Sequence, residues 1–321
     1  MASNKVKRDL RIVFMGTPAF AVAGLEALLA NNYQVVGVVT AADKPSGRGR
    51  KLMSSAVKQF ALAHQIPLLQ PTNLKSPVFL EALRDLKANL QVVVAFRMLP
   101  KVVWQMPEYG TFNLHASLLP NYRGATPINW AIINGETETG VTTFFIDEHI
   151  DTGAIILKKS VAIGTEEDAG SLHDRLMVTG AQLIVATVEA IARQEAISQE
   201  QSTMPHLKPA PKIDRDTCRI NWSNALSDIF NFIRGLSPYP LAWTELHNGE
   251  KILPVKIVET TKERVSHQYQ IGTLIPEKST LKVATKDGFL YLQKLQLPGK
   301  RKMAIKDVLN GFRFEEGAYM R

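Results

Sequence analysis

The first half of the chain alternates short β-rich runs with segments of helical periodicity, and this order constrains the fold more than any other feature. A strand followed by a helix and then another strand is typical of a parallel sheet with helices on both faces. We therefore expect an α/β fold with a mostly parallel sheet, whose ligand site lies beyond the carboxyl ends of its strands. The predicted strands are Arg11–Met15, Val35–Thr40, Leu90–Phe96 and Gly110–Leu114, and the predicted helices are Ala19–Ala30, Ala56–His64 and Ser76–Leu86.

The second half changes its pattern after a proline-rich segment. A long helical stretch at about 167–193 should complete the first domain, and residues 202–212 carry three prolines among polar residues, which indicates an extended linker. Beyond it, many short strands separated by turn signals suggest a small β-barrel. We place the domains at 1–201 and 213–321, joined by the linker 202–212. The remaining predictions are strands at Val141–Ile146, Ala154–Val161, Leu241–His247, Ile252–Glu259, Gln268–Leu274, Leu281–Ala284 and Phe289–Leu295, and a helix at Asn224–Arg234.

Composition excludes several classes of protein. With 321 residues and 45% hydrophobic content, the chain can fill two cores, so disorder is not expected. The single cysteine, Cys218, forms no intramolecular disulfide, and the sequence has no Cys/His cluster for structural zinc, which fits a reducing compartment. The first apolar run, Ile12–Met15, is too short for a signal peptide or a membrane span. We expect a cytoplasmic protein without a membrane partner.

Positive charge is concentrated in the C-terminal third. Residues 1–200 hold 19 Lys and Arg against 18 Asp and Glu, whereas residues 201–321 hold 19 against 12. A basic module is a common feature of proteins that bind a polyanion, because each neutralised phosphate releases counterions. A basic surface that only keeps the protein soluble is the alternative, and charge alone does not separate the two.

The first strand-to-helix junction does not fit a dinucleotide site. Gly16-Thr17-Pro18 stands where a phosphate-binding loop would lie, but the GxGxxG spacing that lets the main chain approach a pyrophosphate is missing. A plain strand-to-helix turn is the preferred interpretation.

Polar residues follow the last strong apolar strand, where the ligand site is expected. Asn113 and His115 are two positions apart, so both side chains lie on one face of the strand, although buried structural polar residues also occur at such places. The irregular segment 117–128 either shapes a pocket or is a plain connector. Residues 147–153 then supply three acids and His149, of which one or more should serve only the turn.

These runs together resemble the 10-formyltetrahydrofolate-dependent formyltransferases, and the similarity covers essentially the whole chain. It is strongest to those members whose acceptor is the initiator methionyl-tRNA. The runs that carry it are Phe112-Asn113-Leu114-His115, Ser117-Leu118-Leu119-Pro120, Arg123-Gly124, Pro127-Ile128, Asp151-Thr152-Gly153, the loop from Asp43 to Met53, Asn221-Trp222 and Ile233 to Pro240.

The resemblance implies a fold, a reaction and its residues. The implied fold is a Rossmann-like domain joined to an OB-like barrel, and the implied substrates are 10-formyltetrahydrofolate and initiator methionyl-tRNA. We expect no metal, no DNA partner and a monomer. The resemblance assigns catalysis to Asn113, His115 and Asp151, tetrahydrofolate binding to Ser117, Leu118, Leu119 and Pro120, and tRNA contacts to Lys44, Arg48, Arg50 and Lys51.

Two other functions share part of this pattern. A formyltransferase that acts on a nucleotide-linked amino sugar would use the same three catalytic residues, but the basic C-terminal module argues against it. A noncatalytic RNA-binding protein is the second alternative, and the presence of Asn113, His115 and Asp151 argues against that one.

Overall fold

The computed structural model describes residues 6–46, 51–202 and 206–321. The chain divides into two compact units. The first unit consists of Met1–Gly124, Gly140–Val161 and Asp174–Pro209, and the second of Ala125–Thr139, Ala162–His173 and Ala210–Arg321. The domain boundaries drawn from the sequence, at 201 and 213, stay a prediction.

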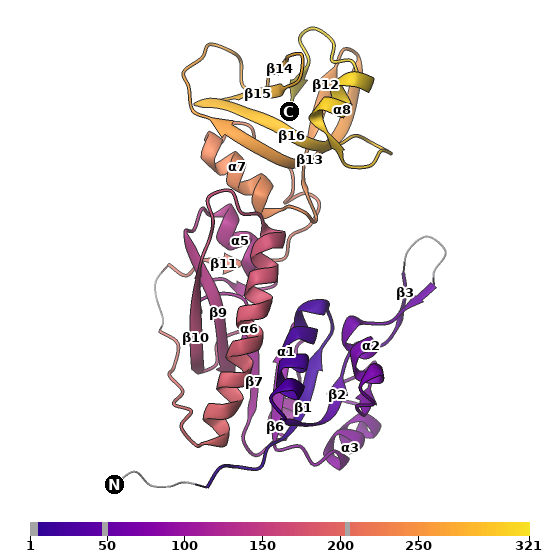
Figure 1. Ribbon diagram of the computed structural model, residues 1–321, viewed down its shortest axis with the longest axis vertical. Helices are drawn as coiled ribbons and strands as arrows, with labels where there is room; N and C mark the ends of the chain where they lie inside the picture. The colour runs from indigo at the N-terminus through magenta and orange to yellow at the C-terminus, as the bar shows by residue number, and fades with distance from the viewer. Residues whose placement is uncertain (1–5, 47–50, 203–205) are drawn as a thin grey trace. The chain divides into compact units, whose positions relative to one another are not determined.

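A seven-stranded sheet forms the centre of the first unit, in the order β10-β9-β7-β6-β1-β2-β5 (Figure 1). The neighbouring strands β5, β2, β1, β6 and β7 pair in parallel, and β9 pairs antiparallel with β7. The mostly parallel, Rossmann-like sheet expected from the sequence is confirmed. Its strands are β1 (Arg11–Gly16), β2 (Gln34–Val39), β5 (Leu68–Leu69), β6 (Leu90–Val94), β7 (Thr111–His115), β9 (Glu138–Phe145) and β10 (Ile155–Ala162).

The central strand β1 explains why helices cover both faces of this sheet. Successive side chains of a strand point to opposite faces, and all of the apolar residues of β1 from Ile12 to Met15 are fully buried. Val13 and Met15 lie in an apolar cluster with Phe79 of α3. The five principal helices described around this sheet are α1 (Ala19–Ala30), α2 (Ala56–Ala63), α3 (Pro77–Asp85), α4 (Lys101–Trp104) and α6 (Ala169–Ala192).

Helix α6 is long and apolar enough to cross a bilayer by length and composition alone. Its side chains Leu176, Ile184 and Val188 are nevertheless buried in the protein. Ile184 lies so close to Gly24 of α1 that a Cβ on that glycine would be 2.5 Å from its Cδ1. Core helices of globular proteins pass the same length and composition test, and α6 packs as one of them.

Several elements of the first half differ from the sequence-based expectation. Strand β6 ends at Val94 rather than Phe96, because Ala95 takes a left-handed backbone with φ 48°. The segment 117–128, which was expected to be irregular, ends in the first two residues of the helix α5 (Pro127–Ile133). Two short strands, β3 (Lys44–Ser46) and β4 (Lys51–Met53), pair as an antiparallel hairpin that sequence periodicity did not indicate.

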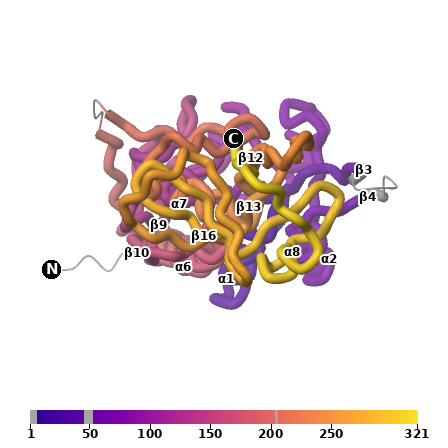
Figure 2. Tube along the Cα trace, turned by 90° about the horizontal axis from the view of Figure 1, so that it is seen from above, coloured from indigo at the N-terminus to yellow at the C-terminus, as the bar shows by residue number. Residues whose placement is uncertain are grey.

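The second unit contains an antiparallel barrel in the order β14-β15-β16-β13-β12-β18, with β17 beside β16. Residues on either side of the remaining gap also pair: Leu274 N donates to Ala318 O at 3.0 Å, and Met320 N to Gly272 O at 2.8 Å. The trace of these strands folds back on itself (Figure 2), and the OB-like barrel is confirmed. Its elements are α7 (Leu226–Gly235), β12 (Ala242–Asn248), β13 (Lys251–Glu263), β14 (Leu274–Pro276), β15 (Leu281–Thr285), β16 (Gly288–Gln296), β17 (Met303–Ala304), α8 (Ile305–Gly311) and β18 (Tyr319–Met320).

One barrel strand was placed wrongly. The sequence predicted a strand at Gln268–Leu274, whereas β14 begins at Leu274. Gly272 has φ +87°, and a Cβ there would lie 2.3 Å from Met320 O. A strand cannot continue through that conformation, so the extended backbone starts only after this glycine.

Candidate active site

Strand β7 places Asn113 and His115 on one face of the sheet, at its carboxyl end. The residue between them, Leu114, points to the other face, where it meets α6 so closely that a Cβ on Gly180 would lie 2.7 Å from it. Asn113 is half-buried, and its side chain has no hydrogen-bond partner among the residues that the structure describes. Its amide is therefore available to a ligand.

The imidazole of His115 is buried between two acceptors. Its Nε2 is 2.8 Å from the main-chain oxygen of Tyr122, and its Nδ1 is 3.7 Å from Oδ2 of Asp151. A carbonyl oxygen can only accept, so Nε2 carries a proton. Nδ1 is thus the ring nitrogen without a close hydrogen bond, and it faces a carboxylate.

Asp151 belongs to the turn between β9 and β10, and its backbone is left-handed with φ 56°. Gly124 N donates to its Oδ2 at 2.9 Å. The turn needs Gly153, because a Cβ there would lie 1.7 Å from Phe145 O. Asp147 closes the turn by accepting from Thr152 Oγ1 at 2.8 Å. Of the acids in this segment, Asp147 therefore shapes the turn and Asp151 faces His115.

The segment Ser117–Pro120 is held firmly by its neighbours. Ser117 Oγ donates to Asn121 O at 2.7 Å, and Thr142 Oγ1 donates to Ser117 O at the same distance. Leu119 is buried, and Lys158 Nζ donates to its carbonyl oxygen at 2.5 Å. Burial lowers the pKa of Lys158. The partly exposed members, Leu118 and Pro120, are the ones that a ligand can reach.

A cavity of about 700 Å³ opens after the carboxyl end of β6, and sequence reasoning missed it. Its lining includes Leu74 and Leu99, which belong to the apolar cluster that also holds Val93. Val93 is the β6 neighbour of Asn113 in the strand register. The cavity therefore lies on the same face of the sheet as Asn113. Its full lining is Thr72, Asn73, Leu74, Lys75, Arg97, Met98, Leu99, Pro100, Lys101 and Val102.

One signal in the sequence could have pointed to this cavity. Arg97 and Met98 follow directly after the strand that the sequence predicts at Leu90–Phe96, and ligand sites gather at the carboxyl ends of parallel strands. Arg97 is fixed there, because its guanidinium donates to the main-chain oxygens of Pro71 and Thr72. Met98 is 69% exposed, which is unusual for so apolar a side chain.

The residues expected to contact tRNA are only partly described. Lys44 is exposed in β3, and Lys51 belongs to β4. Arg48 and Arg50 lie outside the described residues.

Neither a reactive thiol nor a metal site is found among the described residues. Cys218 is buried, its Sγ donates to Asp214 O, and burial raises the pKa of its thiol. No group of three or more His, Cys, Asp or Glu side chains in the described part of the chain could hold a metal ion.

Comparison with known proteins identifies the family. A family model described as formyl transferase matches residues 10–188, and one of the formyl transferase C-terminal domain matches residues 212–313. The chain belongs to the formyl transferase family.

Two curated methionyl-tRNA formyltransferases are similar to this chain over nearly its full length. The methionyl-tRNA formyltransferase of Flavobacterium johnsoniae is 56% identical over 96% of this chain and 98% of its own length. The methionyl-tRNA formyltransferase of Bacteroides thetaiotaomicron is 52% identical over 98% of this chain and 99% of its own length. The solved structure of an N-formyltransferase from Helicobacter canadensis is 22% identical, with a TM-score of 0.65 over 88% of this chain and 98% of that one. At that identity the likeness shows the fold alone.

Proposed function

We propose that this protein transfers the formyl group of 10-formyltetrahydrofolate to the α-amino group of initiator methionyl-tRNA. The observation that carries the proposal is the 52–56% identity to methionyl-tRNA formyltransferases over nearly the full length of both chains. The pair of buried His115 and partly buried Asp151, with the free amide of Asn113 on the same strand as His115, supports it, because acyl transfer needs donors and a proton path at one point.

The folate co-substrate fits the cavity after β6. Leu74, Leu99 and Val102 offer an apolar wall to a flat heteroaromatic ring, while Lys75 and Lys101 offer cations to an anionic glutamate tail. Ser117 and Leu119 anchor the segment Ser117–Pro120, and Leu118 and Pro120 are its partly exposed members. In this proposal, cavity and segment together hold the formyl donor beside Asn113.

Asn113 stabilises the charge that develops on the formyl oxygen. The attacking amine forms a bond to the formyl carbon, and that carbon becomes tetrahedral with a negative oxygen before its bond to the folate nitrogen breaks. A preorganised amide donor at such an oxygen contributes on the order of 3 to 4 kcal/mol in comparable acyl transfers. The Asn113 side chain has no competing partner among the described residues, so its donor is free for this contact.

His115 and Asp151 handle the proton that must leave the attacking amine. His115 Nε2–H is held by Tyr122 O, so Nδ1 is the ring position that can exchange a proton or donate to the oxyanion. Asp151 stabilises the charged imidazolium from 3.7 Å and accepts a proton through water. The proton then passes to the departing folate nitrogen, which leaves neutral.

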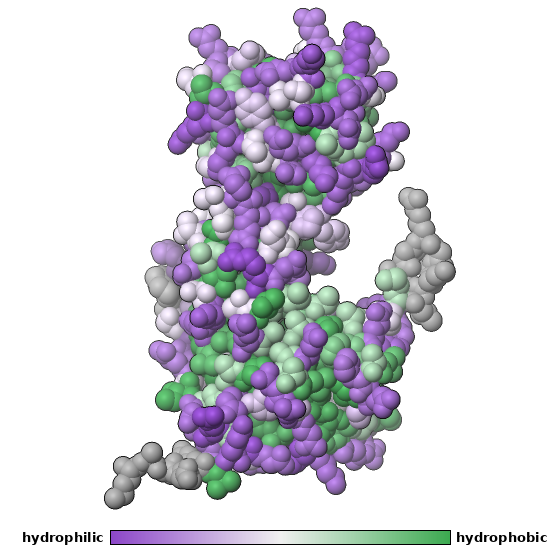
Figure 3. All heavy atoms as spheres, viewed as in Figure 1, coloured by the Kyte–Doolittle hydropathy of each residue, from purple (hydrophilic) through white to green (hydrophobic). Residues whose placement is uncertain are grey.

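Recognition of tRNA is assigned to the basic parts of the chain. Lys44, Arg48, Arg50 and Lys51 supply four cations within a short stretch of the sequence, and residues 201–321 supply an excess of positive charge. The barrel surface in view in Figure 3 is mostly hydrophilic, as a surface that meets RNA would be. The proposal places the protein in the cytoplasm as a monomer.

The test is a formyl-transfer assay with 10-formyltetrahydrofolate and three samples: charged initiator methionyl-tRNA, a nucleotide-linked amino sugar, and no acceptor. Formylation of the tRNA alone is expected. Transfer only to the sugar would keep the three catalytic residues and reject the tRNA assignment, and transfer to neither acceptor would reject the proposed activity.

Arg48→Ala should weaken use of the tRNA and leave folate binding intact. Equal loss of tRNA use and folate binding would remove Arg48 from tRNA recognition.

A further inference from the structure

The side chain of Gln201 joins two parts of the candidate active site that are far apart in sequence. Its Nε2 donates to the main-chain oxygens of Asp151 and Gly153, each at 2.9 Å. Its Oε1 accepts from Nε and Nη2 of Arg123, at 3.1 and 2.6 Å. An amide has two donor hydrogens and two acceptor lone pairs. Every hydrogen-bonding position of this side chain is therefore used.

The main chain that carries Gln201 is fixed as well. Two residues earlier, Gln199 pairs with Ile155 at the start of β10: Gln199 N donates to Ile155 O at 2.8 Å, and Ile155 N to Gln199 O at 2.7 Å. The side chain of Gln199 is exposed, so only its backbone takes part. The backbone pairing of Gln199 with Ile155 therefore fixes the main chain close to Gln201.

Asp151 requires this kind of external support. A left-handed backbone at a residue other than glycine costs about 1 kcal/mol or more and persists only where its surroundings hold it. Its carboxylate accepts from the N–H of Gly124, the residue directly after Arg123. By binding Arg123 and the main chain of Asp151 at once, Gln201 closes a ring of contacts around the carboxylate that faces His115.

We infer that Gln201 is a positioning residue, which fixes the carboxylate of Asp151 against His115 for proton transfer. This inference rests on the proposed function of the site. Without Gln201 the turn loses the two hydrogen bonds that the Gln201 amide donates, and the guanidinium of Arg123 loses its acceptor, so among the described residues the carboxylate of Asp151 is held by Gly124 N alone. A displacement of about 1 Å in such a group costs up to about 100-fold in rate.

The experiment compares Gln201→Met with Gln199→Met, a matched change two residues away that removes no side-chain contact. In Gln201→Met, kcat for formyl transfer should fall about 10- to 100-fold, and the pH profile of kcat should change shape. The KM values for both substrates should stay within about twofold of wild type, because binding contacts remain. Gln201→Glu keeps an acceptor for Arg123 but loses both donors, so the same fall in kcat is expected. This variant replaces Gln201→Met in the experiment if Gln201→Met fails to fold.

A second readout is independent of turnover. The ¹⁵N chemical shifts of the His115 ring, recorded at one pH, should change in Gln201→Met and stay as in wild type in Gln199→Met. Unchanged kcat and ring shifts in a folded Gln201 variant would overturn the inference, as would an equal loss in both variants. If wild type formylates no acceptor, the proposed function fails, while the ring shifts still decide whether Gln201 positions Asp151.

Discussion

At the scale of single residues, the candidate site separates side chains that face a ligand from side chains that hold them. Asn113 has no protein partner among the described residues, whereas His115 and Asp151 are each fixed by a main-chain group, Tyr122 O and Gly124 N. Substitution of a side chain whose only partner is the substrate should lower kcat without lowering the stability of the fold. Substitution of a side chain that is held by the protein should lower both kcat and stability.

Asn113→Ala provides the first test of this division. We expect kcat to fall about 100- to 1,000-fold, the usual cost of losing one oxyanion donor, with little change in the KM for folate. Steady-state formyl transfer measures both, and urea unfolding should give the midpoint of wild type. Asn310→Ala, an exposed asparagine in α8, is the control and should keep full activity. A large rise in KM with unchanged kcat would place Asn113 in ground-state binding instead.

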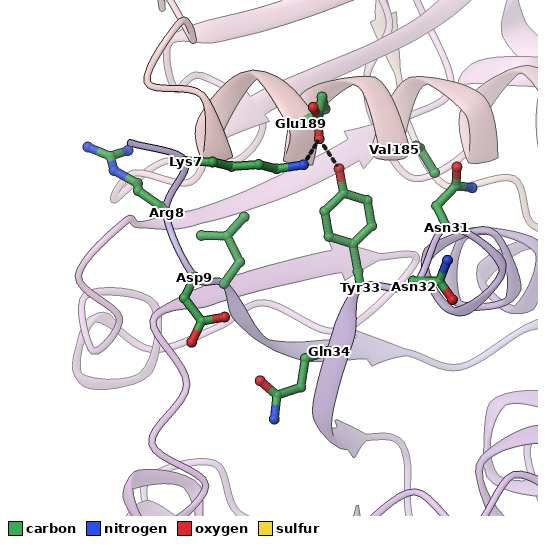
Figure 4. A pocket seen from close by; sticks show the side chains of 10 residues that line it. Lys7, Arg8, Asp9, Asn31, Asn32, Tyr33, Gln34, Val185 and Glu189 are labelled. Atoms are coloured by element: carbon green, nitrogen blue, oxygen red, sulfur yellow. Dashed lines mark hydrogen bonds and ion pairs between the residues drawn. The ribbon is translucent and has the colours of Figure 1, made fainter. Parts of the chain in front are cut away.

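At the scale of secondary-structure elements, Glu189 of α6 joins the N-terminal segment and the start of β2. Figure 4 shows Lys7 and Tyr33 directed at its carboxylate, on the wall of a cavity of about 510 Å³. Lys7 Nζ and Tyr33 OH lie 2.7 and 2.5 Å from Oε2, and Arg193 Nε lies 2.6 Å from Oε1. Hydrogen bonds from Lys7, Tyr33 and Arg193 lower the pKa of Glu189 from 4.5 to about 2. This carboxylate therefore links α6 to the N-terminal segment and to the residue before β2.

The hydrogen bonds to the Glu189 carboxylate predict that the free energy of unfolding falls at low pH. Because the folded-state pKa of Glu189 is below the unfolded value, its contribution is fully present above pH 4.5 and is lost as the pH falls towards about 2. Wild type should therefore exceed Glu189→Gln in free energy of unfolding at pH 7, and the gap should narrow between pH 4.5 and 2. Urea unfolding across that range measures it. Glu81→Gln, at an exposed site in α3, should show no such gap.

Gly272 tests the closure of the barrel. Its φ is +87°, and a Cβ added to it would lie 2.3 Å from Met320 O, so Gly272→Ala combines backbone strain with a clash. Gly299→Ala is a matched control, because Gly299 has φ +70° but nothing within 4 Å of its Cβ position. We expect Gly299→Ala to cost about 1 kcal/mol of unfolding free energy and Gly272→Ala to cost clearly more. Equal losses in denaturant unfolding would contradict the proposed clash.

How well an element could be predicted depended on whether its pattern is local. Helix α1 has the bounds Ala19–Ala30 that the sequence indicated, because Pro18 and Asn31 mark its two ends locally. Strand β14 was misplaced because its limit is set by Met320, nearly fifty residues away. The same holds for the site: the spacing of Asn113 and His115 is local, whereas the bonds of Gln201 to Asp151 join segments 50 residues apart.

At the scale of the whole molecule, the uneven distribution of charge predicts how the two substrates respond to salt. Residues 201–321 carry 19 Lys and Arg against 12 Asp and Glu. Affinity for tRNA should fall steeply between about 50 and 200 mM salt, because each phosphate contact releases counterions. Affinity for folate, measured in the same buffers by fluorescence quenching, should change little. A tRNA affinity that is insensitive to salt would remove the basic residues from recognition.

The two ends of the seven-stranded sheet are ill suited to aggregation. An exposed edge strand offers unpaired main-chain groups to another copy of the chain, and long flat edges nucleate fibres. Here one edge, β5, is only two residues long, and the other, β10, exposes Lys159 and has its first residue paired with Gln199. A second copy of the chain would find only the short strand β5 to pair with at one edge, and a lysine of like charge at the other edge, β10. Both edges of the sheet therefore carry features that oppose edge-to-edge pairing.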